Sequence, residues 1–456
     1  MSSNTSRREF LRRASALSVA GTAAPWALNL AAIGEAAAAT ATDYKALVCI
    51  FLFGGNDYAN TLPPYDQASW NAYSAQRSTL ATPRDEISAT LLKPTQALAG
   101  GLQYALAPEL SPLLPLFDAS RLAVLLNVGT LIQPTSKAQY SAKSVPLPPK
   151  LFSHNDQQSV WQSSSPEGST SGWGGRMGDL FASGNGNATF TCVSVTGNAV
   201  YLAGKTTAQY QVSSAGSVAV NAVKAPLFGS SACSQALQTL VTLPRTHLLE
   251  NELARVLKRS IDSDAQLSSA LAATPPLNTQ FPISTLSSQL QMVSKMIAAR
   301  DPLGARRQVF LVSLGGFDNH DDLDTDHPEL LTVVGQALAA FDAAMQELGL
   351  ADKVTAFTAS DFGRTLTSNG TGADHGWGGH HLVMGGAVKG RAIYGTPPQL
   401  ANNGPDDVGQ GRLLPTTSVD QYGATLARWF GVSDSDLALV MPNLANYSLK
   451  DLGFMA

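Results

Sequence analysis

Residues Val354 to Arg364 read Val-Thr-Ala-Phe-Thr-Ala-Ser-Asp-Phe-Gly-Arg and place an acid, Asp361, just after a run of apolar residues. The run is short enough to be a buried β-strand. A glycine-rich loop follows, and it carries Asp374, His375, His380 and His381. Ligands of open α/β sheets bind where strands end, so this stretch predicts a functional site. A flexible loop whose histidines cap turns would show the same residues.

The same pattern occurs further upstream. The apolar run Tyr44–Phe53 ends in Gly-Gly-Asn-Asp with Asp57, and the run Gln308–Leu314 ends in Gly-Gly-Phe-Asp-Asn-His with Asp318 and His320. A further strand is expected at Arg121–Val128, and helical periodicity fills much of the chain between these runs. Strands that alternate with helices predict the α/β class with a largely parallel sheet.

The expected strand ends gather acids and imidazoles at one edge of the sheet. So many carboxylates would repel one another unless cations compensate them. Mixed Asp and His ligands suit zinc or manganese, and mainly Asp ligands suit magnesium or calcium. Single aspartates at strand ends are also common as caps and turn residues. We predict a divalent metal site whose ligands come from this gathered set: Asp57, Asp318, His320, Asp321, Asp322, Asp361, Asp374, His375, His380 and His381.

Two further residues are candidates for catalysis. Ser153 opens a short helical pattern that contains Asp156 three residues on, as in an N-terminal capping pair. A hydroxyl at a helix start lies near free backbone N–H groups, which suits a nucleophile that attacks an anionic centre, although an ordinary cap has the same geometry. Arg364 could neutralise a bound oxyanion or make a surface ion pair.

The N-terminus predicts export. Ser6–Arg12 contains a twin-arginine motif, an uncharged stretch runs from Ala14 to Gly34, and Ala37–Ala39 offers a cleavage site. We expect residues 1–39 to be a signal peptide rather than a membrane anchor, and the twin-arginine machinery to deliver the chain to the periplasm or cell exterior. Cleavage removes four arginines and two glutamates, so the net charge goes from −4 to about −6. No transmembrane segment remains, and without a basic stripe nucleic acid is excluded as a partner.

Residues 40–456 are expected to form a single domain with a partly β insertion around residues 185–230. Alternating residues in Thr189–Val212 predict antiparallel hairpins around Gly197-Asn198. The chain has three cysteines, and Cys49 lies in an apolar run. A disulfide between Cys192 and Cys233 fits an oxidising periplasm, but the sequence does not establish it.

The ordered series of motifs resembles a known family. Gly-Gly-Asn-Asp, Ser-His-Asn-Asp-Gln-Gln, Gly-Gly-Phe-Asp-Asn-His, Ser-Asp-Phe-Gly-Arg and Asp-His-Gly-Trp-Gly-Gly-His follow a twin-arginine signal in that order. This series is similar to the bacterial family called domain of unknown function 1501, which looks like a remote branch of the alkaline phosphatase and sulfatase superfamily. The resemblance implies a three-layer α/β/α sandwich with metals at the carboxyl edge of a mostly parallel sheet.

The resemblance also implies roles. The superfamily's first metal acid corresponds to Asp57, its nucleophile to Ser153, its acid-histidine pair to Asp318 and His320, its later acid to Asp361 and its last histidine to His375. Two positions depart from the pattern: Phe362 stands where phosphatases have a ligand histidine, and Asp318 and His320 are two rather than four residues apart. One metal, or a site that binds without catalysis, is therefore an alternative to a two-zinc centre.

These observations favour an exported metal-dependent hydrolase that acts on a small anionic phosphate or sulfate ester. The alternative is a non-catalytic periplasmic protein that keeps the hydrolase fold and binds or scaffolds a protein partner. The family supplies no activity that separates them. A serine hydrolase of the α/β type is disfavoured, because the sequence contains no Gly-x-Ser-x-Gly motif.

Overall fold

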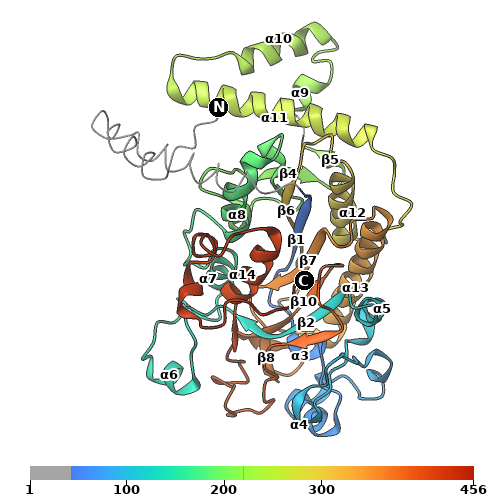
Figure 1. Cartoon of the computed structure of the whole chain (residues 1–456), viewed down its shortest axis with the longest axis vertical. Coiled ribbons are helices and arrows are strands. Elements are labelled where there is room, and N and C mark those ends of the chain that lie inside the picture. The colour runs from blue at the N-terminus through green and yellow to red at the C-terminus, as the bar shows by residue number, and fades with distance from the viewer. Residues whose placement is uncertain (1–42, 219) are drawn as a thin grey trace, which may run out of the picture.

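The computed structural model describes residues 43–218 and 220–456 and is built around one large sheet (Figure 1). The strands are β1 (Lys45–Leu52), β2 (Leu122–Gly129), β3 (Cys192–Ser194), β4 (Tyr210–Ser213), β5 (Gly216–Ser217), β6 (Arg307–Leu314), β7 (Val354–Ser360), β8 (Arg364–Ser368), β9 (Ala373–His375), β10 (Gly379–Met384), β11 (Ala392–Tyr394) and β12 (Thr417–Ser418). The main sheet has the order β11-β2-β10-β7-β1-β6-β3-β4-β5, with β12 beside β2, and β8 pairs with β9 separately.

The centre of the sheet is parallel. Strand β1 lies between β6 and β7 and runs parallel to both, so that Leu52 is in register with Leu314 on one side and Ser360 on the other. Strand β10 is antiparallel to its neighbours β7 and β2. The predicted α/β class with a mostly parallel sheet is confirmed, and the four strands expected from apolar runs all form within a few residues of their predicted bounds.

Helices cover both faces of this sheet. They are α3 (Tyr58–Thr61), α4 (Gln67–Arg77), α5 (Leu114–Asp118), α6 (Lys137–Ala142), α7 (His154–Ser163), α8 (Trp173–Phe181), α9 (Asn221–Lys224), α10 (Ser231–Thr242), α11 (Leu248–Ala273), α12 (Thr285–Ala298), α13 (Leu323–Glu347), α14 (Val419–Phe430) and α15 (Leu437–Val440). Helix α14 begins after the capping box of Ser418 and ends before Gly431, which adopts the left-handed conformation.

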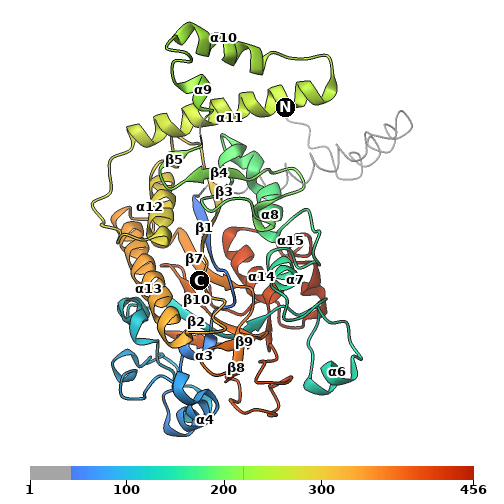
Figure 2. The same ribbon diagram turned by 180° about the vertical axis from the view of Figure 1, so that it is seen from behind.

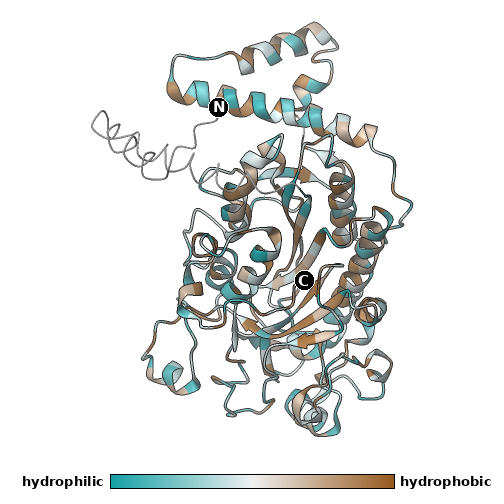
Figure 3. Cartoon of the chain, viewed as in Figure 1, coloured by the Kyte–Doolittle hydropathy of each residue, from teal (hydrophilic) through white to brown (hydrophobic). Residues whose placement is uncertain are grey.

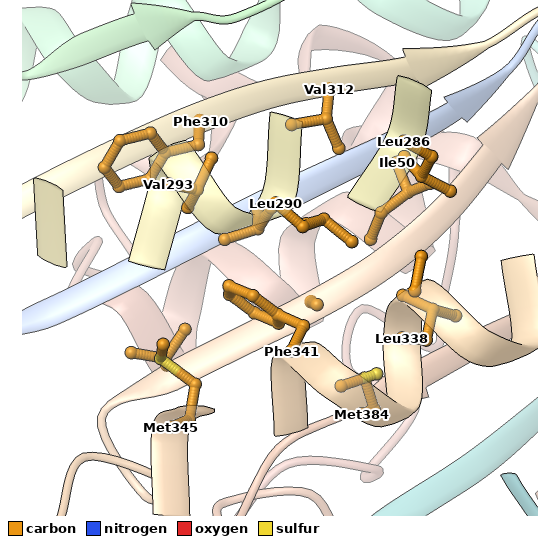
Figure 4. Packing of buried hydrophobic residues seen from close by; sticks show 14 of the residues in the cluster. Ile50, Leu286, Leu290, Val293, Phe310, Val312, Leu338, Phe341, Met345 and Met384 are labelled. Atoms are coloured by element: carbon orange, nitrogen blue, oxygen red, sulfur yellow. The ribbon is translucent and has the colours of Figure 1, made fainter. Parts of the chain in front are cut away.

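Alternate residues of β1 face two separate cores, which gives three layers. Val48 and Ile50 pack against α12 and α13, where Leu290 and Phe341 lie opposite the sheet (Figure 4). On the other face Cys49 packs in a cluster built with α8 and α14. The central strands are accordingly apolar along their length (Figure 3). A strand buried on both faces has no polar alternation, which is why these runs could be recognised in the sequence.

One expectation for the region around β3 to β5 is wrong, and the pairing of Cys192 with Cys233, which the sequence left open, does not form. Strands β3 and β4 pair in parallel and extend the main sheet, so they do not form a hairpin around Gly197-Asn198; only β4 and β5 are antiparallel. Cys192 is buried beneath α8, whereas Cys233 is exposed on α10, and both thiols are free. Strand β3 needs its partner β6, which lies more than a hundred residues away and leaves no local signal.

The helices α9 to α11 stand beyond one end of the sheet, and the loops that carry the predicted site lie at the other end, near α3, β8 and β9 (Figures 1 and 2). Within the part of the chain that the structure describes, no helix combines the length and apolar character that a bilayer crossing needs. The predicted signal peptide, residues 1–39, lies outside the described residues.

Candidate metal centre

Glycines let the ends of β1, β6 and β7 close on one another. Gly54 and Gly55 follow β1 with φ values of 118° and 90°. A Cβ on Gly54 would lie 2.3 Å from the backbone N of Asp318, and one on Gly55 would lie 2.3 Å from the Phe362 ring. Other residues would clash here and also rarely adopt these φ values. The three predicted strand-end loops therefore meet, as the sequence pattern required.

A group of three side chains at this edge has the chemistry of a metal site. His154, Asp318 and His375 each offer one ligand atom, and these atoms all lie within 4.8 Å of one another. The two Nε2 atoms are 3.1 Å apart, and Asp318 approaches Nε2 of His375 to 3.2 Å and Nε2 of His154 to 3.4 Å. Ligands of a tetrahedral ion with bonds of about 2.0–2.1 Å stand roughly 3.3 Å apart, so this spacing fits one small divalent cation.

Hydrogen bonds at the second ring nitrogen orient the imidazoles of His154 and His375. Nδ1 of His375 lies 2.7 Å from the carbonyl oxygen of Phe152, and Nδ1 of His154 lies 2.6 Å from Oδ2 of Asp361. Both oxygens accept, so each Nδ1 carries the proton and each neutral ring keeps its Nε2 lone pair for the cluster. Metal-binding histidines are held in the same way, by an acceptor on the second nitrogen.

His320 stands beside this group. Its Nε2 lies 2.8 Å from Nε2 of His375 and 3.1 Å from Oδ1 of Asp318, and its Nδ1 lies 3.3 Å from Asp374. Two imidazole nitrogens at such a distance need a shared proton or a cation, because two lone pairs in contact repel. The His320 side chain is 42% exposed, so it can also reach an ion from the solvent side.

Charge and burial favour the cation-binding protonation states of Asp318 and His375, but not that of His154. Burial raises the pKa of Asp318, whereas the hydrogen bond and the charge of Arg364 lower it. The lowering effects prevail, so the pKa of Asp318 lies below its ordinary value. Burial lowers the pKa of His375. The hydrogen bond that His154 donates to Asp361 instead raises the pKa of His154, which favours the protonated ring. An ionised carboxylate and a neutral imidazole are the ligand forms that zinc or manganese requires.

Asp57 is not part of this group. Its carboxylate pairs with the fully buried Arg77 and accepts hydrogen bonds from the backbone N–H groups of Ala59 and Asn60 at the start of α3. Burial raises the pKa of Asp57, and the charge of Arg77 lowers it to below its ordinary value. In this arrangement the acid closes a helix and neutralises an arginine, which is the role that capping aspartates usually have.

Asp361 and Arg364 lie behind the cluster rather than within it. Asp361 is fully buried, and it accepts from Gln158 and from the backbone N–H of Gly54 besides His154. Arg364 is also fully buried and donates to Asp318 Oδ1 at 3.0 Å. Both side chains therefore position a residue of the His-Asp-His group, and the guanidinium of Arg364 has no exposed surface for a substrate.

Ser153 lies next to the cluster along the backbone. Its neighbour Phe152 binds His375, and its other neighbour is His154 itself. The Ser153 hydroxyl donates to Oδ2 of Asp156 at 2.9 Å, so the predicted Ser-Asp pair forms, but through the side chains rather than through the backbone of α7. In the described residues its hydroxyl makes no hydrogen bond to the three cluster residues.

His154 is the site residue that sequence reasoning missed. It follows Ser153 in the Ser-His-Asn-Asp motif. No apolar run precedes this motif, so the sequence gave no reason to place His154 near the ends of the strands. The histidines of the Gly-rich loop behave differently from one another. His375 joins the cluster, whereas His380 and His381 are buried, and burial lowers the pKa of each to about 3. Both pack as neutral rings against aromatic side chains.

Solved structures with some similarity include sulfatases. The structure of Ps i-CgsB in complex with k-i-k-neocarrahexaose is 10% identical, with a TM-score of 0.36 over 89% of this chain and 77% of that one. The PsFucS1 sulfatase from Pseudoalteromonas sp. is 11% identical, with a TM-score of 0.33 over 93% of this chain and 76% of that one. Likeness of this extent carries no conclusion about activity. The comparison with curated proteins found no match.

The family described as "Protein of unknown function (DUF1501)" matches residues 44–441, which span the sheet, its flanking helices and all of the candidate metal centre. The predicted family resemblance is confirmed over nearly the whole described chain. The chain therefore belongs to the DUF1501 family.

Proposed function

We propose that this protein is an exported, metal-dependent hydrolase of phosphate or sulfate esters. The observation that carries the proposal is the group His154, Asp318 and His375, whose ligand atoms lie within one ion's reach at the carboxyl edge of the sheet. The three side chains are 25–47% exposed, so a small anionic ester has access to them. A metal at such an edge polarises an ester oxygen and lowers the pKa of a bound water.

The chain's own residues hold this centre in a binding-competent form. Asp361 and the Phe152 carbonyl keep the Nδ1 protons of His154 and His375 in place, and Arg364 orients Asp318. Zinc or manganese suits two imidazoles and one carboxylate best, and magnesium or calcium would need more oxygen ligands.

Ser153 is the nucleophile in this proposal. Its hydroxyl already donates to Asp156, which can take the proton as the oxygen bonds to phosphorus or sulfur. The bond to the ester oxygen breaks in the same step, and the alcohol leaves with a proton. Water then cleaves the serine ester and releases phosphate or sulfate. Asp156 is buried, with Lys150 3.7 Å from its other oxygen. If Ser153 is not the nucleophile, it serves only to hold Asp156, and loss of the hydroxyl will leave most of the activity.

The proposal includes export through the twin-arginine route, since Ser6–Arg12 and the uncharged stretch after it have the features of such a signal. That route carries folded proteins, so the cluster can take up its ion before export. The small anionic ester then meets the protein in the periplasm or outside the cell. If the protein binds metal but hydrolyses nothing, the alternative is a binding or scaffold protein with the same centre.

The test is an assay of the full chain with a panel of phosphate monoesters, phosphate diesters and sulfate esters, before and after chelation. We expect chelation to abolish hydrolysis and zinc or manganese to restore it. Ser153→Ala should lower kcat by about 100-fold or more, whereas the matched control Ser159→Ala, on the same helix with its hydroxyl bound to the Ser165 carbonyl, should keep it. Metal-replete protein that hydrolyses no member of the panel would refute the proposal.

A further inference from the structure

Exposed apolar side chains concentrate on the helices at the far end of the sheet. Of the eleven large apolar residues that are exposed in the described part of the chain, eight lie between Val218 and Val256: Val218, Phe228, Leu240, Leu243, Leu248, Leu249, Leu253 and Val256. This segment holds α9, α10 and the first half of α11, which project from the body in both views (Figures 1 and 2). A contiguous apolar surface on a folded protein marks an interaction site.

One face of α11 changes from buried to exposed along the helix. Leu267 and Ala270 lie in the main core, and Ser263 is buried four residues before Leu267. The same stripe continues toward the helix start at alternate spacings of three and four residues, through Ser260 to Val256, Leu253 and Leu249, and there the side chains are 40%, 60% and 73% exposed. A stripe with this average repeat of 3.5 residues is the seam along which two helices pack.

Helix α10 adds to this surface. Its twelve residues, Ser231–Thr242, contain no Asp, Glu, Lys or Arg, although most of them are exposed. Leu240 and, just after the helix, Leu243 are 57% and 48% exposed. A solvated surface helix normally carries charges on its outer face, so the composition of α10 indicates a second covered face beside the stripe of α11.

Charges beside the stripe are self-complementary. Glu252 and Arg259 are both exposed and lie seven residues apart, so they flank the stripe on the same side of α11. Glu252 also lies 3.4 Å from Nη1 of Arg255 on its own helix, so Arg259 of the partner subunit would share this carboxylate with Arg255. If two α11 helices pack antiparallel around a two-fold axis near Ala254 and Arg255, Leu253 meets Val256 of the partner subunit. Glu252 then lies beside Arg259 of the partner subunit, and the reverse pair forms as well.

We propose that this surface, α10 with Leu248–Ser260 of α11, is a homodimer interface that holds a second copy of the chain. Two-fold dimers present the same patch on both subunits, and this patch offers an apolar seam flanked by acidic Glu252 and basic Arg255 and Arg259. The surface stands at the end of the sheet opposite to the candidate metal centre, so the dimer leaves that centre open. The proposal does not depend on the proposed activity.

The test is the mass of the full chain in solution, measured by light scattering over a range of concentrations. We expect twice the chain mass for the wild type. Leu249→Asp and Leu253→Asp should raise the dissociation constant by about 100-fold or more, because each places a charge in the centre of the seam. The matched control is Leu439→Asp, which alters a leucine on α15 that is 50% exposed and should leave the dimer intact.

Charge reversal tests the pairing itself. Glu252→Arg and Arg259→Glu should each weaken the dimer, and the double variant should restore it, because both intersubunit pairs then form with opposite sign. Circular dichroism of each variant checks that the fold is kept. A wild type that is monomeric throughout, a dimer that survives Leu253→Asp, or a double reversal that restores nothing would each overturn the proposal, and the first would leave the patch to a different protein or to a membrane.

Discussion

The imidazole of His154 is held by Asp361, whose Oδ2 lies 2.6 Å from Nδ1 of the ring. Since Asp361 orients a ligand and is not itself one, we expect Asp361→Ala to weaken metal binding by about 10–100-fold without abolishing it. His154→Ala should remove stoichiometric binding. Competition with a coloured chelator measures both. Equal and complete loss in the two variants would make Asp361 a ligand after all.

Asp57 provides a contrasting case among the predicted acids. Asp57→Asn leaves the buried Arg77 without its counter-charge, so the free energy of unfolding should fall by about 3–5 kcal/mol. The metal content should stay unchanged, because Asp57 touches none of the three cluster residues in the described structure. Urea denaturation measures the change in unfolding free energy, and elemental analysis measures the metal content. Asp57→Asn/Arg77→Gln should regain part of the lost stability, and a stable, metal-free Asp57→Asn protein would contradict this assignment.

Gly363 keeps β7 and β10 close together at the site. A Cβ there would lie 2.1 Å from the carbonyl oxygen of Gly378, and backbone cannot move aside cheaply. We expect Gly363→Ala to cost about 1–3 kcal/mol of unfolding free energy and to weaken metal binding through the displaced Arg364. Gly370→Ala is the comparison for backbone strain without a clash, because its Cβ meets nothing within 4 Å while its φ of 132° is one that side chains rarely adopt. Equal metal affinity in wild type and Gly363→Ala would argue against this coupling.

Asp420 on α14 makes stability depend on pH. Burial raises its pKa to about 6, well above the unfolded value of about 3.9. The folded state therefore holds the proton more tightly, and this group lowers the free energy of unfolding by about 3 kcal/mol as the pH rises from about 4 through 6. Asp420→Asn should match the wild type near pH 4 and exceed it near pH 8, since Asn still accepts from the Asn443 N–H. A difference that does not vary with pH would contradict this.

The sequence allowed the core of the fold to be predicted, because the runs at β1, β6 and β7 are buried on both faces and lack polar alternation. The glycine pairs after β1 and β6, each followed by an aspartate, also indicated the edge of the sheet where the site lies. The short strands β3 and β4 could not be predicted correctly, since their pairing depends on a distant neighbour.

Individual roles at the site were harder to predict. Asp318 and His375 belong to the cluster, but His154 comes from a helix start that no strand precedes, so only the fold reveals that it joins them. Asp57 has the same Gly-flanked surroundings in sequence as Asp318. The two acids differ in their partners, because Arg77 of α4 pairs with Asp57. The sequence pattern gives no sign of that contact.

The most direct test of the account is elemental analysis of the purified full chain, side by side with His154→Ala and Asp57→Asn. We predict about one zinc or manganese ion for each wild-type chain, the same content in Asp57→Asn, and loss of the ion in His154→Ala. Wild-type protein without a bound divalent metal, even after dialysis against zinc and manganese, would contradict the metal centre and with it the proposed hydrolase.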